Sequence, residues 1–434
     1  MKPVKADGAK GSAYVAFYKE KHQLTGGEHK MQNDWSKLEA ISRKHKRVSG
    51  LMSYVNTETL KAEFNRQSRR KAKGIDGISK IDYKMNLEEN LDDLVKRLKV
   101  FSYHPKPVRR VYIPKDNGKE RPLGIPSFED KLVQGAMAKA LESVYEPRFL
   151  DCSYGFRRGR NAHQCISDMN HTLMFKKINY VLDADIKGYF DNVDHEWLIK
   201  FLENDIDDKN YIRYIKRLLR AGVIEDNKLY ETDKNVPQGG VISPTLANVY
   251  LHYVLDLWFE KRIKPRLRGN GYLFRYADDF TIMFQYEDDS IEIYKALISR
   301  FAKFGLELAE DKTKIIPFGR YKGTKESFDF LGFRFINGVD RKGNYRVHIR
   351  TSKKKLKIKK QSAKKWLTTK MHEPVWQTLK ILKVKLRGHI NYYGVNGNYK
   401  SIGNFFSYVR YTYFRILRRR GQKNPIKYKD FIRI

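Results

Sequence analysis

Cysteine is scarce in this sequence, and long apolar runs are missing from it. The two cysteines, Cys152 and Cys165, do not form a CxxC pair, so a structural zinc site is not expected. Sparse cysteine use is typical of a reducing cytoplasm. No apolar run approaches the ~20 residues that a membrane span requires, and the N-terminus lacks the apolar segment of a signal peptide. We therefore expect a cytoplasmic protein with no membrane partner.

Acidic residues are also few relative to basic ones. The chain has 87 Lys and Arg against 50 Asp and Glu, and its formal net charge is +37 at pH 7. Residues 351–434 alone hold 23 Lys or Arg, 13 aromatic residues and two acids, Glu373 and Asp430. Cations interleaved with rings suit a nucleic-acid backbone and stacked bases, although many of the rings are also expected in a helical core. The composition therefore predicts a polyanionic partner.

Strand and helix patterns alternate irregularly along the 434 residues, a length that allows two or three packed subdomains. This irregular order favours an α+β fold over a doubly wound sheet. Residues 1–50 are predicted to be partly helical and partly mobile. Helices are predicted at 51–99 with a glycine turn at 73–77, at 130–144, 195–204, 244–259 and 290–304, and over most of the chain beyond 353. Strands are predicted at 108–113, 121–126, 179–185, 272–275, 280–284, 328–335 and 345–349.

Two adjacent acids lie at a predicted tight turn between two short apolar strands. Asp278 and Asp279 repel each other there, and a divalent cation would remove the repulsion. Hard oxygen ligands at a hairpin tip suit Mg²⁺, and Asp185, at the end of another predicted strand, supplies a third carboxylate. Such a set can hold two ions roughly 3.5–4 Å apart for nucleotidyl transfer. The alternative is ordinary turn chemistry, because Asp is common in turns.

The segments around these acids resemble the motifs of reverse transcriptases. Tyr276-Ala277-Asp278-Asp279 resembles the YxDD motif of that family, and residues 183–191, where Phe190 follows Asp185 by five residues, resemble its first palm motif. Residues 236–248 resemble the second palm motif, and residues 330–333 resemble the primer grip. All four occur in the order of the family. The resemblance implies an α+β right-hand polymerase with fingers, a palm built on an antiparallel sheet, and a helical thumb.

The resemblance is closer to group II intron reverse transcriptases, also called maturases, than to retroviral enzymes, and it covers the chain from about residue 50 onward. It implies an extension of unknown role at 1–50, fingers at 51–178, a palm at 179–337 and a basic helical thumb at 338–434. Because two cysteines cannot build the endonuclease module of many such proteins, that module is not expected. The similar segments are 74–77 for the extra N-terminal motif, 111–115, 121–126 and 153–160 for the fingers, and 386–394 for the thumb region called domain X.

The resemblance also implies a metal site and a proton donor. Asp185, Asp278 and Asp279 would hold two Mg²⁺ ions, with Mn²⁺ as a substitute, and Ile186 would complete the metal site. Lys312 would protonate the leaving pyrophosphate, whereas a lysine in a charged loop is usually only solvated. Asp183 shares a strand face with Asp185 and is expected to be structural.

The resemblance also implies residues that bind the nucleotide and the nucleic acid. Lys115 and Arg121 would contact the triphosphate, because a point cation and a fork-shaped donor suit phosphate oxygens. Phe190 would act as a steric gate that selects deoxynucleotides, the alternative being a core aromatic. The full set is Lys115, Arg121, Phe190, Gln238 and Gly239 for the nucleotide, and Tyr276, Ala277, Leu331, Gly332, Arg387 and His389 for RNA or primer.

Four functions stay open at this point. The first is a bacterial enzyme that makes cDNA from an RNA template, a DNA primer and dNTPs, and that binds a structured intron RNA to assist splicing. The second is a stand-alone reverse transcriptase that copies a dedicated non-coding RNA in antiviral defence or beside a CRISPR system. The third is an RNA-binding splicing cofactor without polymerase activity, which the three intact acids disfavour. The fourth is an RNA-templated RNA polymerase, which Phe190 disfavours. The oligomeric state is left open.

Overall fold

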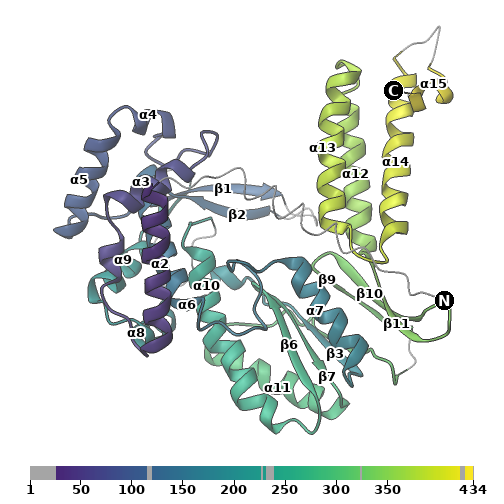
Figure 1. Cartoon of the computed structure of the whole chain (residues 1–434), viewed down its shortest axis with the longest axis horizontal. Coiled ribbons are helices and arrows are strands. Elements are labelled where there is room, and N and C mark those ends of the chain that lie inside the picture. The colour runs from purple at the N-terminus through teal and green to yellow at the C-terminus, as the bar shows by residue number, and fades with distance from the viewer. Residues whose placement is uncertain are drawn as a thin grey trace, which may run out of the picture.

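The computed structural model describes residues 26–114, 120–225, 228–230, 239–322, 325–420 and 426–433. These residues form three β-sheets with surrounding helices, and helices α12–α14 lie to one side of the rest (Figure 1). The α-helices are α2 Gly26–Lys44, α3 Thr57–Arg66, α4 Lys80–Lys84, α5 Leu87–Lys99, α6 Phe128–Tyr145, α7 Ala162–Phe175, α8 His195–Asp205, α9 Lys209–Leu219, α10 Ser243–Leu251, α11 Glu287–Lys303, α12 Lys353–Thr369, α13 Val375–Tyr393, α14 Tyr399–Arg418 and α15 Tyr428–Arg433.

The palm sheet carries the strand ends at which the acids were predicted. Its order is β6-β7-β3-β8, and every neighbouring pair is antiparallel. Because side chains alternate between the two faces of a strand, Leu182 packs into one buried cluster with α6, α8 and α10, and Val181 packs into another with α7. Both faces are therefore covered. The strands are β3 Tyr180–Ala184, β6 Gly271–Tyr276, β7 Asp279–Phe284 and β8 Lys314–Pro317.

A second sheet lies in the fingers, in the order β2-β1-β4-β5. Strand β1 is Val108–Pro114 and pairs with β2, Glu120–Ile125, in an antiparallel hairpin. Strand β4, Val223–Glu225, pairs with β1 in parallel and with β5, Lys228–Tyr230, in antiparallel fashion. This sheet therefore takes strands from both the range 51–178 and the range 179–337 that the sequence assigned to fingers and palm.

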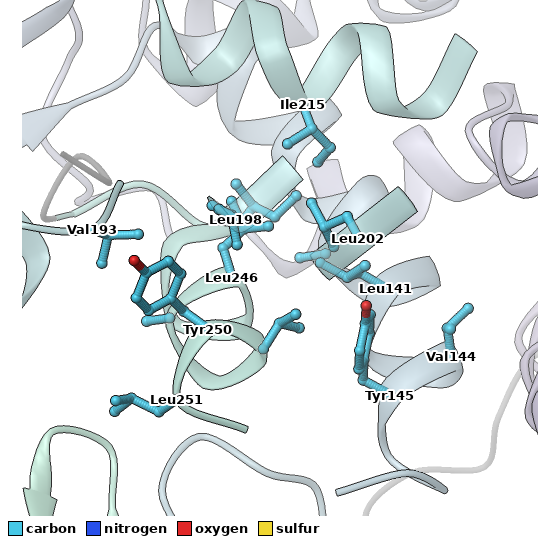
Figure 2. Packing of buried hydrophobic residues seen from close by; sticks show 14 of the residues in the cluster. Leu141, Val144, Tyr145, Val193, Leu198, Leu202, Ile215, Leu246, Tyr250 and Leu251 are labelled. Carbon is cyan, nitrogen blue, oxygen red and sulfur yellow. The ribbon is translucent and has the colours of Figure 1, made fainter. Parts of the chain in front are cut away.

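The largest core lies where the fingers helices meet the palm. Helix α6 is capped at its N-terminus by Ser127, whose hydroxyl accepts a hydrogen bond from the Asp130 backbone N–H at 3.2 Å. Most residues of the helix are buried. A helix that is apolar on nearly all sides belongs inside a core. Figure 2 shows Leu141 of α6, Leu202 of α8 and Ile215 of α9 within this cluster.

The third sheet has the order β11-β10-β9 and leads into the thumb. The prediction of one strand at 328–335 was wrong, because Leu331 and Gly332 have φ of 48° and 79° and form a tight turn between β9, Ser327–Phe330, and β10, Phe333–Val339. Positive φ at both central residues is the pattern of a hairpin turn. Strand β11, Tyr345–Thr351, completes the sheet. The thumb helices α12–α14 then pack around a separate apolar cluster.

The predicted helix at 244–259 is also divided. Regular α10 ends at Leu251, and two π-helical segments follow, η3 at His252–Asp256 and η4 at Phe259–Ile263. Short 3₁₀ turns occur at Leu51–Tyr54 (η1), Tyr189–Asp191 (η2) and Lys264–Arg266 (η5). π-Helical turns are uncommon and are frequent at functional sites, so the η3 segment becomes relevant to the site.

The arrangement confirms the predicted α+β fold class, with fingers, an antiparallel palm sheet and a helical thumb. Within the parts of the chain that the structure describes, no helix has both the length and the apolar character needed to cross a membrane.

Candidate active site at the end of the palm sheet

Strand pairing brings the three predicted acids to one edge of the palm sheet. Strand β3 pairs with β7 so that Ala184 lies opposite Phe280, and the next residues outward are Asp185 and Asp279. Strands β6 and β7 pair from Tyr276 and Asp279, which leaves Ala277 and Asp278 as a two-residue turn. The acids that are far apart in the sequence therefore meet at adjacent strand ends.

The turn itself has an unusual backbone. Ala277 has φ 59°, a left-handed conformation that costs energy for a residue with a Cβ. The chain from Cys152 to Gly155 lies against it, because a Cβ added to Gly155 would be 2.4 Å from the Ala277 nitrogen. A glycine is therefore required at position 155 for the close approach of the two backbones.

The carboxylates at this edge influence one another electrostatically. Desolvation, followed by the charges of Asp278 and Asp185, raises the pKa of Asp279 to about 7. Desolvation also raises the pKa of Asp278, and the nearby charge of Asp185 adds to this rise. Asp183 is part of the same field, since desolvation and the charge of Asp279 raise its pKa to about 7. Protein folding gains nothing from such crowding, whereas a bound cation would relieve it.

Two lysines and an arginine face these acids. Lys312, in the loop before β8, forms an ion pair with Asp185 and hydrogen-bonds to it, which raises the lysine pKa. The charge of Arg121 on β2 partly offsets the rise in the pKa of Asp278, and that of Lys355 on α12 partly offsets the rise in the pKa of Asp279. The fingers, palm and thumb thus each contribute a cation near the carboxylates. The sequence reasoning did not single out Lys355.

The acids are not arranged as a closed ligand cage. Among the described residues, no group of three or more His, Cys, Asp or Glu side chains lies in a geometry that would hold a metal ion. The Asp185 carboxylate is instead paired with Lys312. Ile186 has a buried side chain, 3% exposed, so only its backbone carbonyl could contribute to a metal site.

Three of the predicted nucleotide-binding residues, Arg121, Phe190 and Gly239, lie within the described residues. Arg121 is exposed on β2. Phe190 is half-buried on η2, whereas the adjacent Tyr189 is a core residue whose hydroxyl donates to the Ala247 carbonyl at 2.6 Å. Gly239 has φ 107°, and a Cβ there would lie 2.6 Å from the carbonyl oxygen of Gly124, so its close approach is to the β2 backbone. Lys115 and Gln238 lie outside the described residues.

The predicted primer residues divide into two groups. Tyr276 and Ala277 are half-buried at the turn. Leu331 and Gly332 form the β9–β10 turn, and the Tyr392 hydroxyl of α13 donates to the Leu331 carbonyl at 2.9 Å. This turn therefore contacts the base of the thumb.

Arg387 and His389 precede Tyr392 on α13 and differ in exposure. Arg387 is exposed to solvent. His389 is only 7% exposed and stacks on Phe405 with ring centroids 4.1 Å apart. Its buried position gives no support to the prediction that it contacts nucleic acid.

Sequence reasoning also missed a buried charged residue next to the turn. Arg275 lies between the buried Phe274 and Tyr276 and is 0% exposed, paired with Asp256 of η3. A signal existed, because an arginine inside an otherwise apolar strand requires a buried partner. The sequence did not show where that partner lies.

Comparison with known proteins identifies the family. A family model described as reverse transcriptase (RNA-dependent DNA polymerase) matches residues 113–335, slightly more than half of the chain. Group II intron-encoded protein LtrA of Lactococcus lactis subsp. cremoris is 31% identical over 401 residues, which cover 74% of this chain and 66% of LtrA. Protein YkfC of Escherichia coli (strain K12) is 32% identical over 304 residues, which cover 63% of this chain and 78% of YkfC.

The match thus spans 66% of the length of LtrA, which is just under two thirds, and 78% of the length of YkfC. Among solved structures, telomerase from Candida albicans in complex with a fragment of telomeric RNA aligns with a TM-score of 0.46 and 14% identity, over 78% of this chain and 64% of that chain. From the family match and the two bacterial relatives we conclude that this chain belongs to the reverse transcriptase family and to its group II intron type.

Proposed function

We propose that this chain is an RNA-directed DNA polymerase of the group II intron type, which also binds a structured intron RNA and assists its splicing. The observation that carries the proposal is the pairing of β3 with β7, which sets Asp185 beside the turn that holds Asp278 and Asp279. An acidic turn alone would be ordinary turn chemistry. A third carboxylate brought there by a different strand, in a chain of this family, favours nucleotidyl transfer.

The donor set fits a pair of divalent cations. Asp278 and Asp279, whose pKa values are raised partly by neighbouring carboxylates, form with Asp185 a set of three hard oxygen ligands suited to Mg²⁺, with Mn²⁺ as a substitute. When bound, the ions would activate the primer 3′-hydroxyl and stabilise the leaving pyrophosphate. We assign the ligands to Asp185, Asp278 and Asp279, with the Ile186 carbonyl as a further oxygen. Lys312, which Asp185 keeps protonated, is suited to give a proton to the pyrophosphate.

The substrates would contact residues from all three parts of the molecule. We assign the incoming dNTP to Lys115, Arg121, Gln238 and Gly239, with Phe190 below the sugar as a gate against a 2′-hydroxyl. The template and primer would pass between the catalytic turn and the thumb. The residues assigned to that path are Tyr276, Ala277, Leu331, Gly332 and Arg387.

A primer-extension assay tests the polymerase assignment. The protein is incubated with an RNA template, an annealed DNA primer, dNTPs and Mg²⁺, and product length is measured. We expect extension by the natural sequence, none by Asp279→Asn, and normal extension by Asp92→Asn, which removes a carboxylate from the exposed face of α5. Absence of product from the natural sequence, where a control reverse transcriptase works, would refute the proposal.

The RNA partner requires a separate test. The similarity to LtrA, which is named a group II intron-encoded protein, supports an intron RNA as the partner. Sequencing the RNA that copurifies with the protein from its host should recover a self-splicing intron RNA, and adding the protein to that RNA at low Mg²⁺ should accelerate splicing. Recovery of a short structured non-coding RNA instead would favour a defence or CRISPR-associated role.

A further inference from the structure

An arginine that directly precedes the catalytic turn is completely buried. Arg275 is 0% exposed, as is the Asp256 carboxylate that faces it. Taking both charges out of water is costly unless the geometry of the pair is very good. Here the guanidinium faces the carboxylate edge-on, with Nε 2.7 Å from Oδ1 and Nη2 2.5 Å from Oδ2. This bidentate arrangement is the strongest geometry for such a pair.

The remaining guanidinium donors also have partners. A guanidinium carries five N–H donors, and two of them face Asp256. Nη1 donates to the Asn248 side-chain oxygen at 2.9 Å and to the Ala277 carbonyl at 3.0 Å, and Nη2 donates to the Ser153 hydroxyl at 2.8 Å. Every donor is thus used, and one of them holds the backbone of the turn itself.

Each partner comes from a different segment of the chain. Asn248 lies on α10, and its amide also donates to the Gly155 carbonyl at 2.7 Å. Asp256 is the last residue of the π-helical segment η3, where the wider turn departs from the α-helical periodicity. Ser153 belongs to the segment that pairs with Arg275, since the Arg275 N–H donates to the Cys152 carbonyl at 2.8 Å. Arg275 therefore joins three segments to one strand end.

This network acts on a backbone that needs support. Ala277 sits at φ 59°, a conformation that persists only when its surroundings enforce it. The hydrogen bond from Arg275 Nη1 to the Ala277 carbonyl lies one residue from Asp278 and two from Asp279. The nearby His252 ring does not compete for Asp256, because burial lowers its pKa to about 4 and leaves it neutral.

We propose that Arg275, held by Asp256, is a positioning residue that fixes the Ala277 backbone and thereby sets the affinity of the Asp278–Asp279 turn for divalent cations. The inference rests on the proposed function, because it assigns a metal-binding role to those acids. A buried ion pair alone is weak evidence for a contribution to stability. The contact with the turn gives this pair a further role.

The decisive variant is Arg275→Lys, which keeps the positive charge beside Asp256 but cannot reach Ala277 and Ser153 at the same time. The matched control is Arg148→Lys, because Arg148 also pairs with a largely buried acid, Asp205, at 2.7 Å. Its other donors reach Ser42 and carbonyls near residue 45, away from the turn.

Two readouts separate positioning from stability. The first is the affinity for Mn²⁺ alone, measured by electron paramagnetic resonance without nucleic acid or dNTP, and the second is the Mg²⁺ concentration that gives half-maximal primer extension. We expect Arg275→Lys to weaken Mn²⁺ binding about tenfold and to raise the Mg²⁺ requirement similarly. We expect Arg148→Lys to leave both unchanged at a comparable loss of melting temperature.

A milder variant keeps the test decisive if Arg275→Lys does not fold. Ser153→Ala removes one acceptor of the Arg275 guanidinium, and we expect it to weaken Mn²⁺ binding two- to threefold. Mn²⁺ affinity equal to that of the natural sequence in every folded Arg275 and Ser153 variant would overturn the inference while the proposed function stood. If the natural sequence itself extends no primer, the proposed function fails first.

Discussion

A buried arginine at the end of the palm sheet and a buried histidine in the thumb differ in how their polar atoms are satisfied. In the palm, all five donors of Arg275 have acceptors. In the thumb, His389 is 7% exposed, and within the described residues neither ring nitrogen has a hydrogen-bond partner. Satisfied networks fix one geometry, whereas apolar packing tolerates several. Arg275 is thus held in place by directional hydrogen bonds, whereas His389 is held by packing against Tyr393 and Phe405.

The palm edge and the thumb also differ in charge. The palm edge concentrates acids, and its nearest cations, such as Lys312 and Arg121, come from neighbouring segments. The thumb helices expose cations around an apolar core that includes Leu367, Leu382 and Val409. Mutual repulsion of those cations is relieved when a polyanion binds. We therefore expect the arrangement of the thumb to respond more than that of the palm to a bound nucleic acid.

The largest expected effect comes from Gly155→Ala in the palm. The new Cβ would lie 2.4 Å from the Ala277 nitrogen and 3.0 Å from the Tyr276 carbonyl carbon, so the turn must shift. A displacement of this kind can cost on the order of 10²-fold in rate. Primer extension at saturating Mg²⁺ measures the loss. Activity within about twofold of the natural sequence would mean that the turn tolerates movement, and that its geometry is not what limits catalysis.

The pH dependence of stability tests the unsatisfied histidine of the thumb. Burial, followed by the charge of Lys359 on α12, lowers the pKa of His389 to about 4 from its usual 6.5. Because the folded pKa lies below the unfolded value, the neutral ring stabilises the fold above pH 6.5, and this contribution is lost as the pH falls toward 4. The ring packs between Tyr393 and Phe405. We expect a loss on the order of 1–3 kcal/mol across this window.

The histidine test uses two variants in the same bundle. His389→Phe keeps an aromatic ring beside Phe405 but cannot be protonated, so its thermal unfolding should depend less on pH between 6.5 and 4. His372→Phe changes an exposed histidine and should follow the profile of the natural sequence. Parallel profiles for the natural sequence and His389→Phe would show that burial of this imidazole has no cost.

Removing exposed thumb cations should have a smaller effect, on nucleic-acid affinity. Lys354 and Lys357 are exposed on α12. Changing both to Gln should reduce the slope of log affinity against log salt by up to about two, and weaken RNA binding about tenfold at moderate salt. Lys200 and Lys295, exposed on palm helices, are the matched pair. Equal effects of the two pairs would remove the distinction between palm and thumb as nucleic-acid surfaces.

The strands and the turn of the candidate site could be predicted from the sequence, because their signals are local. Three apolar runs indicate strands: one runs up to Asp185, one precedes Tyr276 and one follows Asp279. The turn between the last two follows from the motif. Strand β3 was expected at 179–185 and lies at Tyr180–Ala184. The sequence did not predict the register between β3 and β7. This register brings Asp185 opposite Asp279, and it depends on contacts between residues far apart in the chain.

The missed features share a different cause. Arg275 and Asp256 are 19 residues apart, and their pairing depends on a π-helical segment that no local propensity predicts. The β9–β10 turn was missed because Leu331, not a glycine, takes a positive φ of 48° beside Gly332. The parallel pairing of β1 with β4 requires tertiary contact. Each involves a residue whose conformation is set by distant neighbours rather than by its own preference.

The smallest expected effect tests the tolerance of the thumb directly. Gly388 lies inside α13, and a Cβ added there meets no atom within 4 Å. Because glycine in a helix interior is less favourable than alanine by roughly 0.5–1 kcal/mol, Gly388→Ala should raise the free energy of unfolding by about that amount. Gly394→Ala is the matched change at the end of the same helix, where the Cβ would lie 2.5 Å from the Ile390 carbonyl oxygen, and it should destabilise. Thermal unfolding of both variants distinguishes the cases, and a destabilising Gly388→Ala would mean that this face of α13 packs as closely as the palm turn does.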